Sequence, residues 1–196
     1  DVLLLRFLLH SDPEEAVAAW RLWRPGWNPD VPTLEHYRLY PLMAERVAAL
    51  VPDEPTLGML RGVHRQSTIQ TLLMLDHLED VLATLDRTGI DSVVLKGAAL
   101  SLSVYGHVGQ RPFHDLDVLV DARRHAQALS ALRGQGWILK ADDYIGNHAV
   151  TLERAGVLLD VHRKLSKELV LTGRRTSAWD HIETAAARRP LQSGRT

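Results

Sequence analysis

Apolar residues recur every three or four positions through the first part of the chain, which is the period of an amphipathic helix. The sequence Ser11-Asp12-Pro13-Glu14-Glu15 gives a helix start, because Asp caps, Pro fits the first turn and acids suit a helix N-terminus. Helices are predicted over 2–9, 16–23, 34–50 and 59–85, with a glycine stop at Gly89. The first part of the chain is therefore predicted to be all-helical.

The period changes at Ile90, where short β-branched runs and turn residues begin to alternate with helical segments. Strands are predicted over 92–95, 116–120, 137–141, 147–154 and 157–162, and helices over 98–105 and 122–133. Ala155-Gly156 is predicted to be a tight hairpin turn. This order predicts an α+β fold, in which a helical N-terminal region precedes a small mixed β-sheet with flanking helices. The expected division is a helical region over 1–88, an α/β core over 89–170 and a polar tail over 171–196.

Composition narrows the function classes. The 196 residues carry 23 Lys+Arg and 24 Asp+Glu, for a formal charge of -1, so no overall basic field would attract nucleic acid, which is the less expected partner. The absence of cysteine excludes disulfides, thiolate catalysis and Cys-ligated zinc, and it fits a cytoplasmic location. The opening VLLLRFLL is too short to span a bilayer, so no membrane association is expected. Because the chain begins without methionine, we expect a piece of a longer protein.

Two acids lie in the segment HDLDVLV. Asp115 and Asp117 are two residues apart on a predicted strand, so both carboxylates point to one face. Neighbouring carboxylates repel and are costly to bury unless a cation lies between them. A third acid, Asp160, follows on the strand after the hairpin. If the two strands pair, the three acids converge, which predicts a site for a divalent metal and a phosphate.

The residues around the turn at Gly97 are suited to holding a triphosphate. Gly97 and Ala98 expose backbone N–H groups at a predicted helix N-terminus, which attracts anions. Lys96 and Arg111 are the nearest cations and would offset phosphate charge. Each feature alone has a structural explanation, such as a solvated sheet edge or a surface lysine. Their combination in this order favours a site.

Magnesium or manganese would suit the acids. Mg²⁺ prefers octahedral oxygen ligation from carboxylates, waters and substrate phosphates, and a pair of ions stabilises an in-line displacement. Asp115 and Asp117 are predicted to bridge the ions, and Asp160 to ligate the second ion and to help deprotonate an acceptor hydroxyl. His148 and His162 are candidate substrate contacts, although a strand histidine is more often a core or edge residue. By contrast, the helical spacing of Trp20, Trp23 and Trp27 favours a core over a base-stacking surface.

The order LKGAAL, YG, HDLDVLV, GW and DVH resembles the nucleotidyltransferases of the DNA polymerase beta superfamily. The superfamily pattern is a hydrophobic strand, Gly-Gly or Gly-Ser, then Asp-x-Asp, then a later single acid. Gly97-Ala98 corresponds to the first motif, Asp115 and Asp117 to the second, and Asp160 to the third. The resemblance implies Mg²⁺ (or Mn²⁺), an NTP substrate with ATP as the expected one, and catalytic roles for the three aspartates.

More narrowly, the chain is similar to the bacterial "nucleotidyltransferase family protein" group, from about residue 34 to residue 165. Lys96, Arg111, His148 and the triplet Asp160-Val161-His162 also correspond to that group. Two residues depart from it: Ala98 replaces a frequent serine, and Arg163 follows DVH where the group has tryptophan.

The resemblance implies transfer of an NMP group from an NTP to a hydroxyl-type acceptor. Two alternatives remain open: a kinase-like phosphoryl transferase that uses the same two-metal site, and a nucleotide-binding or partner-binding module without turnover. The acceptor is open among small molecules, peptides and proteins.

Overall fold

The computed structural model describes residues 2–31, 33–140 and 148–165. These residues fall into two compact units. The helical unit lies within 1–71 and 105–112, and the sheet unit lies within 72–104 and 113–196. In the described ranges, no helix combines the length and the apolar character that crossing a bilayer requires.

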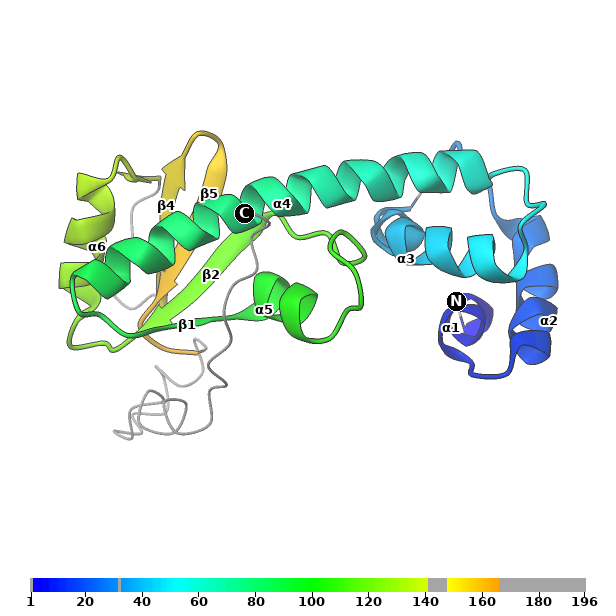
Figure 1. Cartoon of the computed structure of the whole chain (residues 1–196), viewed down its shortest axis with the longest axis horizontal. Coiled ribbons are helices and arrows are strands. Elements are labelled where there is room, and N and C mark those ends of the chain that lie inside the picture. The colour runs from blue at the N-terminus through cyan, green and yellow to red at the C-terminus, as the bar shows by residue number, and fades with distance from the viewer. Residues whose placement is uncertain (1, 32, 141–147, 166–196) are drawn as a thin grey trace. The chain divides into compact units, whose positions relative to one another are not determined.

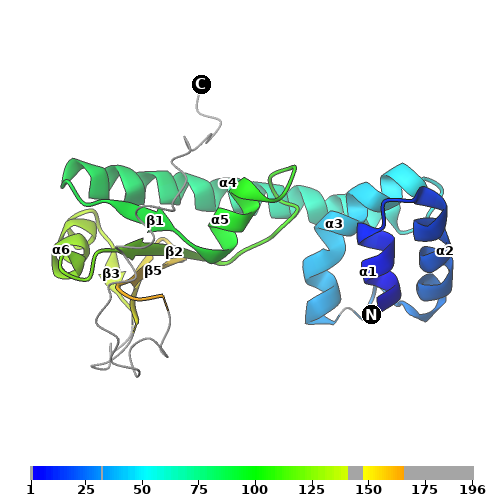
Figure 2. The ribbon, with the colours of Figure 1, turned by 90° about the horizontal axis from the view of Figure 1, so that it is seen from below.

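The helical unit consists of helices that pack side by side (Figure 2). They are α1 (Val2–Leu9), α2 (Pro13–Trp23), a 3-10 turn η1 (Arg24–Gly26), α3 (Leu34–Leu50) and the first half of α4 (Leu57–Arg87). The predicted start of α2 is confirmed, since the Asp12 carboxylate accepts a 2.8 Å hydrogen bond from the backbone N–H of Glu14. The helical prediction for the first part of the chain is therefore confirmed.

An aromatic core holds these helices together. Trp20 and Trp27 are 2% and 6% exposed, and the indole N–H of Trp27 donates a 3.1 Å hydrogen bond to the Tyr40 hydroxyl. Trp23 packs partly buried against the same cluster. Two rings that are nearly inaccessible cannot stack on a base, so the prediction of a helical core is confirmed.

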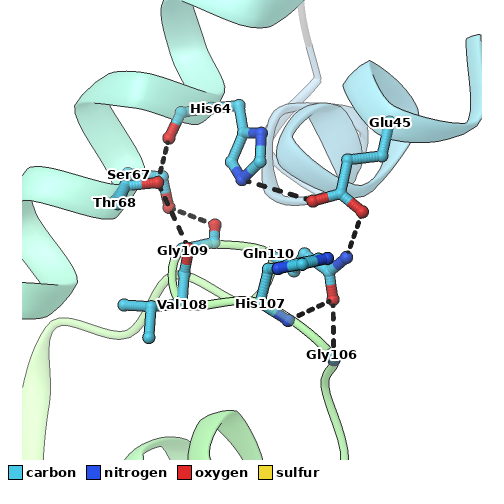
Figure 3. A network of polar contacts seen from close by, with 9 residues as sticks. All are labelled: Glu45, His64, Ser67, Thr68, Gly106, His107, Val108, Gly109 and Gln110. Carbon is cyan, nitrogen blue, oxygen red and sulfur yellow. Dashed lines mark hydrogen bonds and ion pairs between the residues drawn. The ribbon is translucent and has the colours of Figure 1, made fainter. Parts of the chain in front are cut away.

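The loop over 105–112 belongs to the helical unit and packs against α4 (Figure 3). The Ser67 hydroxyl donates a 2.7 Å hydrogen bond to the Gly109 carbonyl, and Thr68 donates one of 3.2 Å to the Val108 carbonyl. Gly109 has a φ of +93°, and a Cβ there would lie 2.4 Å from Thr68 Oγ1. Only glycine fits this turn, because the backbone is left-handed and the helix approaches it closely.

The side chain of Gln110 fixes the rest of this loop. Its amide oxygen accepts hydrogen bonds from the backbone N–H groups of Gly106 and His107, at 3.1 and 3.4 Å, and its amide nitrogen donates to the Glu45 carboxylate on α3. The Glu45 carboxylate also lies 3.7 Å from Nε2 of His64 on α4. Gln110 thus closes the loop on itself and attaches it to the helices (Figure 3).

The sheet unit contains a five-stranded mixed sheet with the order β1-β2-β5-β4-β3. The strands are β1 (Ser92–Val94), β2 (Asp115–Val120), β3 (Ile138–Leu139), β4 (Ala149–Arg154) and β5 (Val157–His162). The helices are α5 (Lys96–Ser103), α6 (His125–Gly134) and the second half of α4, which runs across the sheet (Figure 1). The α+β class, with helices first and a mixed sheet with flanking helices after them, is confirmed.

Strands β4 and β5 form an antiparallel hairpin whose turn is Ala155-Gly156, as predicted. These residues have φ values of +51° and +81°, which is the signature of a type I′ turn. Strand β5 pairs with β4 on one side and in parallel with β2 on the other. Residues 116–120 of β2 are all buried, so β2 and β5 form the centre of the unit.

The prediction of a helix over 122–133 was wrong at its start. α6 begins at His125, because the Asp121 carboxylate accepts a 2.9 Å hydrogen bond from the backbone N–H of Arg123 and so holds a turn before the helix. Within the described residues, the strand predicted over 137–141 is limited to Ile138–Leu139. Residues 141 and 147 of the predicted strands, and the segment from 166 to the end, lie outside the described residues. The expected three-part division of the chain stays a prediction.

Candidate metal centre

The parallel pairing of β2 and β5 brings two of the predicted acids together. In this register Asp117 lies directly opposite Asp160. Directly opposite residues of neighbouring strands project to the same face of a sheet, so the two side chains are neighbours. The pairing that the sequence analysis assumed is therefore confirmed.

His162 joins the two acids, because alternation along β5 places it on the same face as Asp160. One ligand atom from each of Asp117, Asp160 and His162 lies within 4.8 Å of the others. Asp117 and His162 are 1% and 0% exposed, whereas Asp160 is half-buried. The cluster is thus an interior site with Asp160 as its more accessible member.

Asp117 has unequal surroundings at its two oxygens. Oδ1 lies 2.5 Å from Nζ of Lys96 and 2.8 Å from Nε2 of His162. Oδ2 is buried and has no hydrogen-bond partner among the described residues. Burial raises the pKa of Asp117, but the hydrogen bonds from His162 and Lys96 and the Lys96 charge outweigh it, so this pKa lies below its ordinary value. Asp117 is therefore a buried carboxylate with one oxygen available for a cation.

Asp160 is oriented by a neighbouring strand. Its Oδ1 accepts a 2.6 Å hydrogen bond from the hydroxyl of Thr151, which lies opposite it on β4. The sequence analysis missed Thr151. The sequence could have predicted this contact. Thr151 and Asp160 are equally far from the predicted turn at Ala155-Gly156, so they are opposite each other in a two-residue hairpin.

The donor set fits a divalent cation. Carboxylate oxygens are the ligands that Mg²⁺ and Mn²⁺ prefer, and an imidazole nitrogen is acceptable to Mn²⁺ and later transition metals. The Oδ2 atom of Asp117 supports this fit, because an unpaired oxygen of a buried carboxylate is costly unless a cation or donor meets it. The described residues thus contain a candidate metal centre formed by β2 and β5.

Three of the predicted phosphate-binding residues surround the first turn of α5. Lys96 begins this helix after Leu95, which caps it without a side-chain hydrogen bond. Gly97 and Ala98 follow and are buried. A Cβ on Gly97 would lie 2.6 Å from the Cβ of Phe113, so close packing accounts for this glycine.

Residues 26–194 match the family described as uncharacterised nucleotidyltransferase. The chain belongs to this family. A search of curated proteins gives no significant match. The match begins after α2, covers the described residues from there on and includes every predicted site residue, so the candidate centre lies in the part of the chain that defines the family.

The remaining predicted residues of this nucleotidyltransferase-family chain lie at different places. Asp115 is half-buried on β2, two residues before Asp117, and lies opposite Leu158. His148 lies just before β4, with its ring centroid 5.1 Å from that of His162. Arg111 belongs to the loop of the helical unit. Their roles in metal, substrate and nucleotide binding stay predictions.

Proposed function

We propose that this chain is a divalent-metal-dependent nucleotidyltransferase that moves an NMP group from an NTP, with ATP as the expected donor, to a hydroxyl-type acceptor. The observation that carries the proposal is the pairing of Asp117 with Asp160, together with the buried Oδ2 of Asp117, which has no hydrogen-bond partner in the part of the chain that the structure describes. The family match supports the reaction class. The resemblance to the DNA polymerase beta superfamily implies metal-binding and catalytic roles for the Asp-x-Asp motif and for the later acid.

In this proposal Asp115, Asp117 and Asp160 hold Mg²⁺ or Mn²⁺. When bound, the ions offset charge on the phosphate oxygens and assist both the attacking and leaving oxygens. His162, which is fully buried and bonded to Asp117, orients that carboxylate. Thr151 orients Asp160 in the same way. Such outer partners fix the direction of each ligand and its basicity.

The acceptor oxygen forms a bond to the α-phosphorus of the NTP. The bond between that phosphorus and the oxygen that bridges it to the β-phosphorus breaks, and pyrophosphate leaves. The hydroxyl proton passes to Asp160, the most accessible acid of the cluster. The products are the NMP-modified acceptor and pyrophosphate.

Within the sheet unit, the triphosphate is proposed to bind at Lys96, Gly97 and Ala98, while the nucleotide-binding role of Arg111, in the helical unit, stays a separate prediction. Lys96 opens α5, so its ammonium and the N-terminal end of that helix both favour an anion. His148, beside His162, is proposed to contact the acceptor. The acceptor itself is a hydroxyl compound, and its class is left to experiment.

Incubation of the protein with ATP, Mg²⁺ or Mn²⁺ and a metabolite extract tests the proposal, with mass spectrometry of the products and of the protein itself. A mass gain of AMP on any component, with pyrophosphate released, supports it. The matched variants are Asp117→Asn, which should abolish transfer, and Asp53→Asn, an exposed acid of the helical unit that should not.

Separation of the nucleotide products distinguishes nucleotidyl transfer from two alternatives: a kinase-like transfer at the same centre and nucleotide binding without turnover. ADP together with a phosphorylated acceptor identifies a kinase-like transfer, because the γ-phosphorus is then the one attacked. Tight ATP binding without any product across many acceptors identifies a binding module without turnover. Either result would contradict nucleotidyl transfer.

A further inference from the structure

Lys96 is paired with the most buried acid of the candidate centre although much of its own side chain is accessible. Its Nζ lies 2.5 Å from Oδ1 of Asp117, and the side chains are 51% and 1% exposed. An ionised carboxylate at such depth is costly unless an opposite charge accompanies it. Without a metal, Lys96 supplies that charge. Because half of the lysine side chain is in solvent, its ammonium has a route away from the carboxylate.

The backbone at Lys96 holds the side chain in this direction. Its φ is +46°, in the left-handed region that a residue with a Cβ rarely adopts. The neighbours fix this conformation, since Leu95 donates a 2.9 Å backbone hydrogen bond to the Asp117 carbonyl and Gly97 lies under Phe113. Strain of this kind persists where the surrounding structure imposes it, and it is concentrated at functional sites.

We propose that Lys96 is an internal counter-ion of Asp117, held at Oδ1 beside the Oδ2 that is available to a cation, and that a divalent ion bound to this carboxylate displaces it. The displaced ammonium, at the first residue of α5, is then available to the phosphates of the NTP. Metal binding therefore precedes and promotes nucleotide binding. This inference rests on the metal centre of the proposed function and adds an order of binding and a second state for Lys96.

Displacement of Lys96 by the metal can be distinguished by measurement from simultaneous binding of Lys96 and the metal to Asp117. His162 and Lys96 already meet Oδ1, and a divalent ion on the same carboxylate would repel the ammonium. An opposite charge in contact lowers a carboxylate's affinity for a proton by about 10-fold or more, and we expect an effect of similar size on a competing metal ion. If Lys96 must leave, its removal strengthens metal binding. If Lys96 keeps Oδ1 while the metal uses Oδ2 alone, Lys96 stays bound after metal addition.

Calorimetric titration with Mn²⁺ alone tests this on the full chain. Lys96→Met should bind Mn²⁺ about 10-fold tighter than the unsubstituted protein, and Lys96→Arg should bind within about 3-fold of it, because the competing charge is kept. Lys140→Met is the matched control, since Lys140 forms a 2.5 Å ion pair with Glu153 outside the cluster, and it should leave the affinity unchanged.

Each outcome has a distinct meaning. Equal or weaker Mn²⁺ binding by Lys96→Met, with normal binding by the unsubstituted protein, overturns the displacement and leaves the proposed function intact. Absence of Mn²⁺ binding by the unsubstituted protein overturns both. Loss of ATP binding by Lys96→Met in saturating Mn²⁺ supports the second role of Lys96, and unchanged ATP affinity overturns that role.

Amine labelling of the unsubstituted protein gives a test that needs no variant. Lys96 and Lys140 should both react slowly with an amine-specific reagent, as read by peptide mass spectrometry, because both are ion-paired. Mn²⁺ should accelerate labelling of Lys96 several-fold and leave Lys140 unchanged, and ATP added with Mn²⁺ should protect Lys96 again. Labelling of Lys96 that Mn²⁺ does not change, in protein that binds Mn²⁺, contradicts the displacement.

Discussion

The hydroxyl of Thr151 donates a 2.6 Å hydrogen bond to Oδ1 of Asp160 across the β4–β5 hairpin. Asp160 is half-buried, whereas Asp117 is buried, so this bond is a main restraint on the direction of the Asp160 carboxylate. Thr151→Val keeps the shape and removes the donor. We expect a loss of about 10–100-fold in Mn²⁺ affinity or in transfer rate, as is usual when an outer partner of a ligand is removed.

Thr151→Ser provides the control, because it restores the hydroxyl, and most of the lost affinity should return. The measurements are Mn²⁺ calorimetry and the rate of pyrophosphate release. A Thr151→Val protein that is less stable yet binds Mn²⁺ normally would assign Thr151 a purely structural role.

Removal of one partner or the other of the Lys96–Asp117 pair should destabilise the metal-free protein to unequal extents. Lys96→Met leaves a buried carboxylate with less compensation and should lower the free energy of unfolding by about 1–3 kcal/mol. Asp117→Asn removes the buried charge and leaves a lysine that is half in solvent, while the amide oxygen can still accept a hydrogen bond from Nε2 of His162, so its cost should be smaller. Saturating Mn²⁺ should restore Lys96→Met and have no effect on Asp117→Asn. Denaturant unfolding with and without Mn²⁺ measures all four values, and equal losses in the two variants would contradict this asymmetry.

The sequence was sufficient for the parts of the site that follow from periodicity. Alternation placed Asp160 and His162 on one face, and the order of strands suggested that Asp117 would meet Asp160, as the β2–β5 register confirms. Thr151 was within reach of the same reasoning, since the predicted two-residue turn fixes the register of β4 against β5.

Other features depend on side-chain and long-range contacts that the apolar pattern does not carry. The start of α6 is set by the Asp121 side chain, which holds a turn where the apolar pattern alone predicts helix. The left-handed backbone of Lys96 also gives no sequence signal, because it is imposed by neighbours. The attachment of the loop over 105–112 to the helical unit joins residues about forty positions apart, such as Ser67 and Gly109.

Substitution of Gly97 tests whether close packing against Phe113 requires glycine at this position. A Cβ there would lie 2.6 Å from the Cβ of Phe113, so Gly97→Ala should destabilise the protein by about 1–3 kcal/mol through overpacking. Gly62→Ala is the control, because this glycine is inside α4 and nothing lies within 4 Å of its would-be Cβ. That change should stabilise the protein by about 0.5–1 kcal/mol. Thermal or denaturant unfolding measures both signs, and a neutral Gly97→Ala would show that Phe113 can move aside.

Glu54 should make the stability of the helical unit depend on acid pH. Its Oε1 accepts hydrogen bonds from Arg24 at 2.9 Å and from the Thr56 hydroxyl at 2.8 Å, and its side chain is 7% exposed. Burial raises the pKa of Glu54, but the bonds from Thr56 and Arg24 outweigh this, so its pKa in the folded protein lies below the ordinary value of 4.5.

A carboxyl whose pKa is lowered by folding stabilises the protein above its unfolded pKa and loses that contribution as the pH falls through the folded pKa. Glu54→Gln should therefore lower the free energy of unfolding by about 1–2 kcal/mol at pH 7, with a gap that shrinks as the pH falls below 4.5. Denaturant unfolding of both proteins across this range measures the gap, and Asp53→Asn, at an exposed neighbouring acid, should show none. A gap of constant size down to strongly acid pH would mean that the side chain acts through its shape rather than its charge.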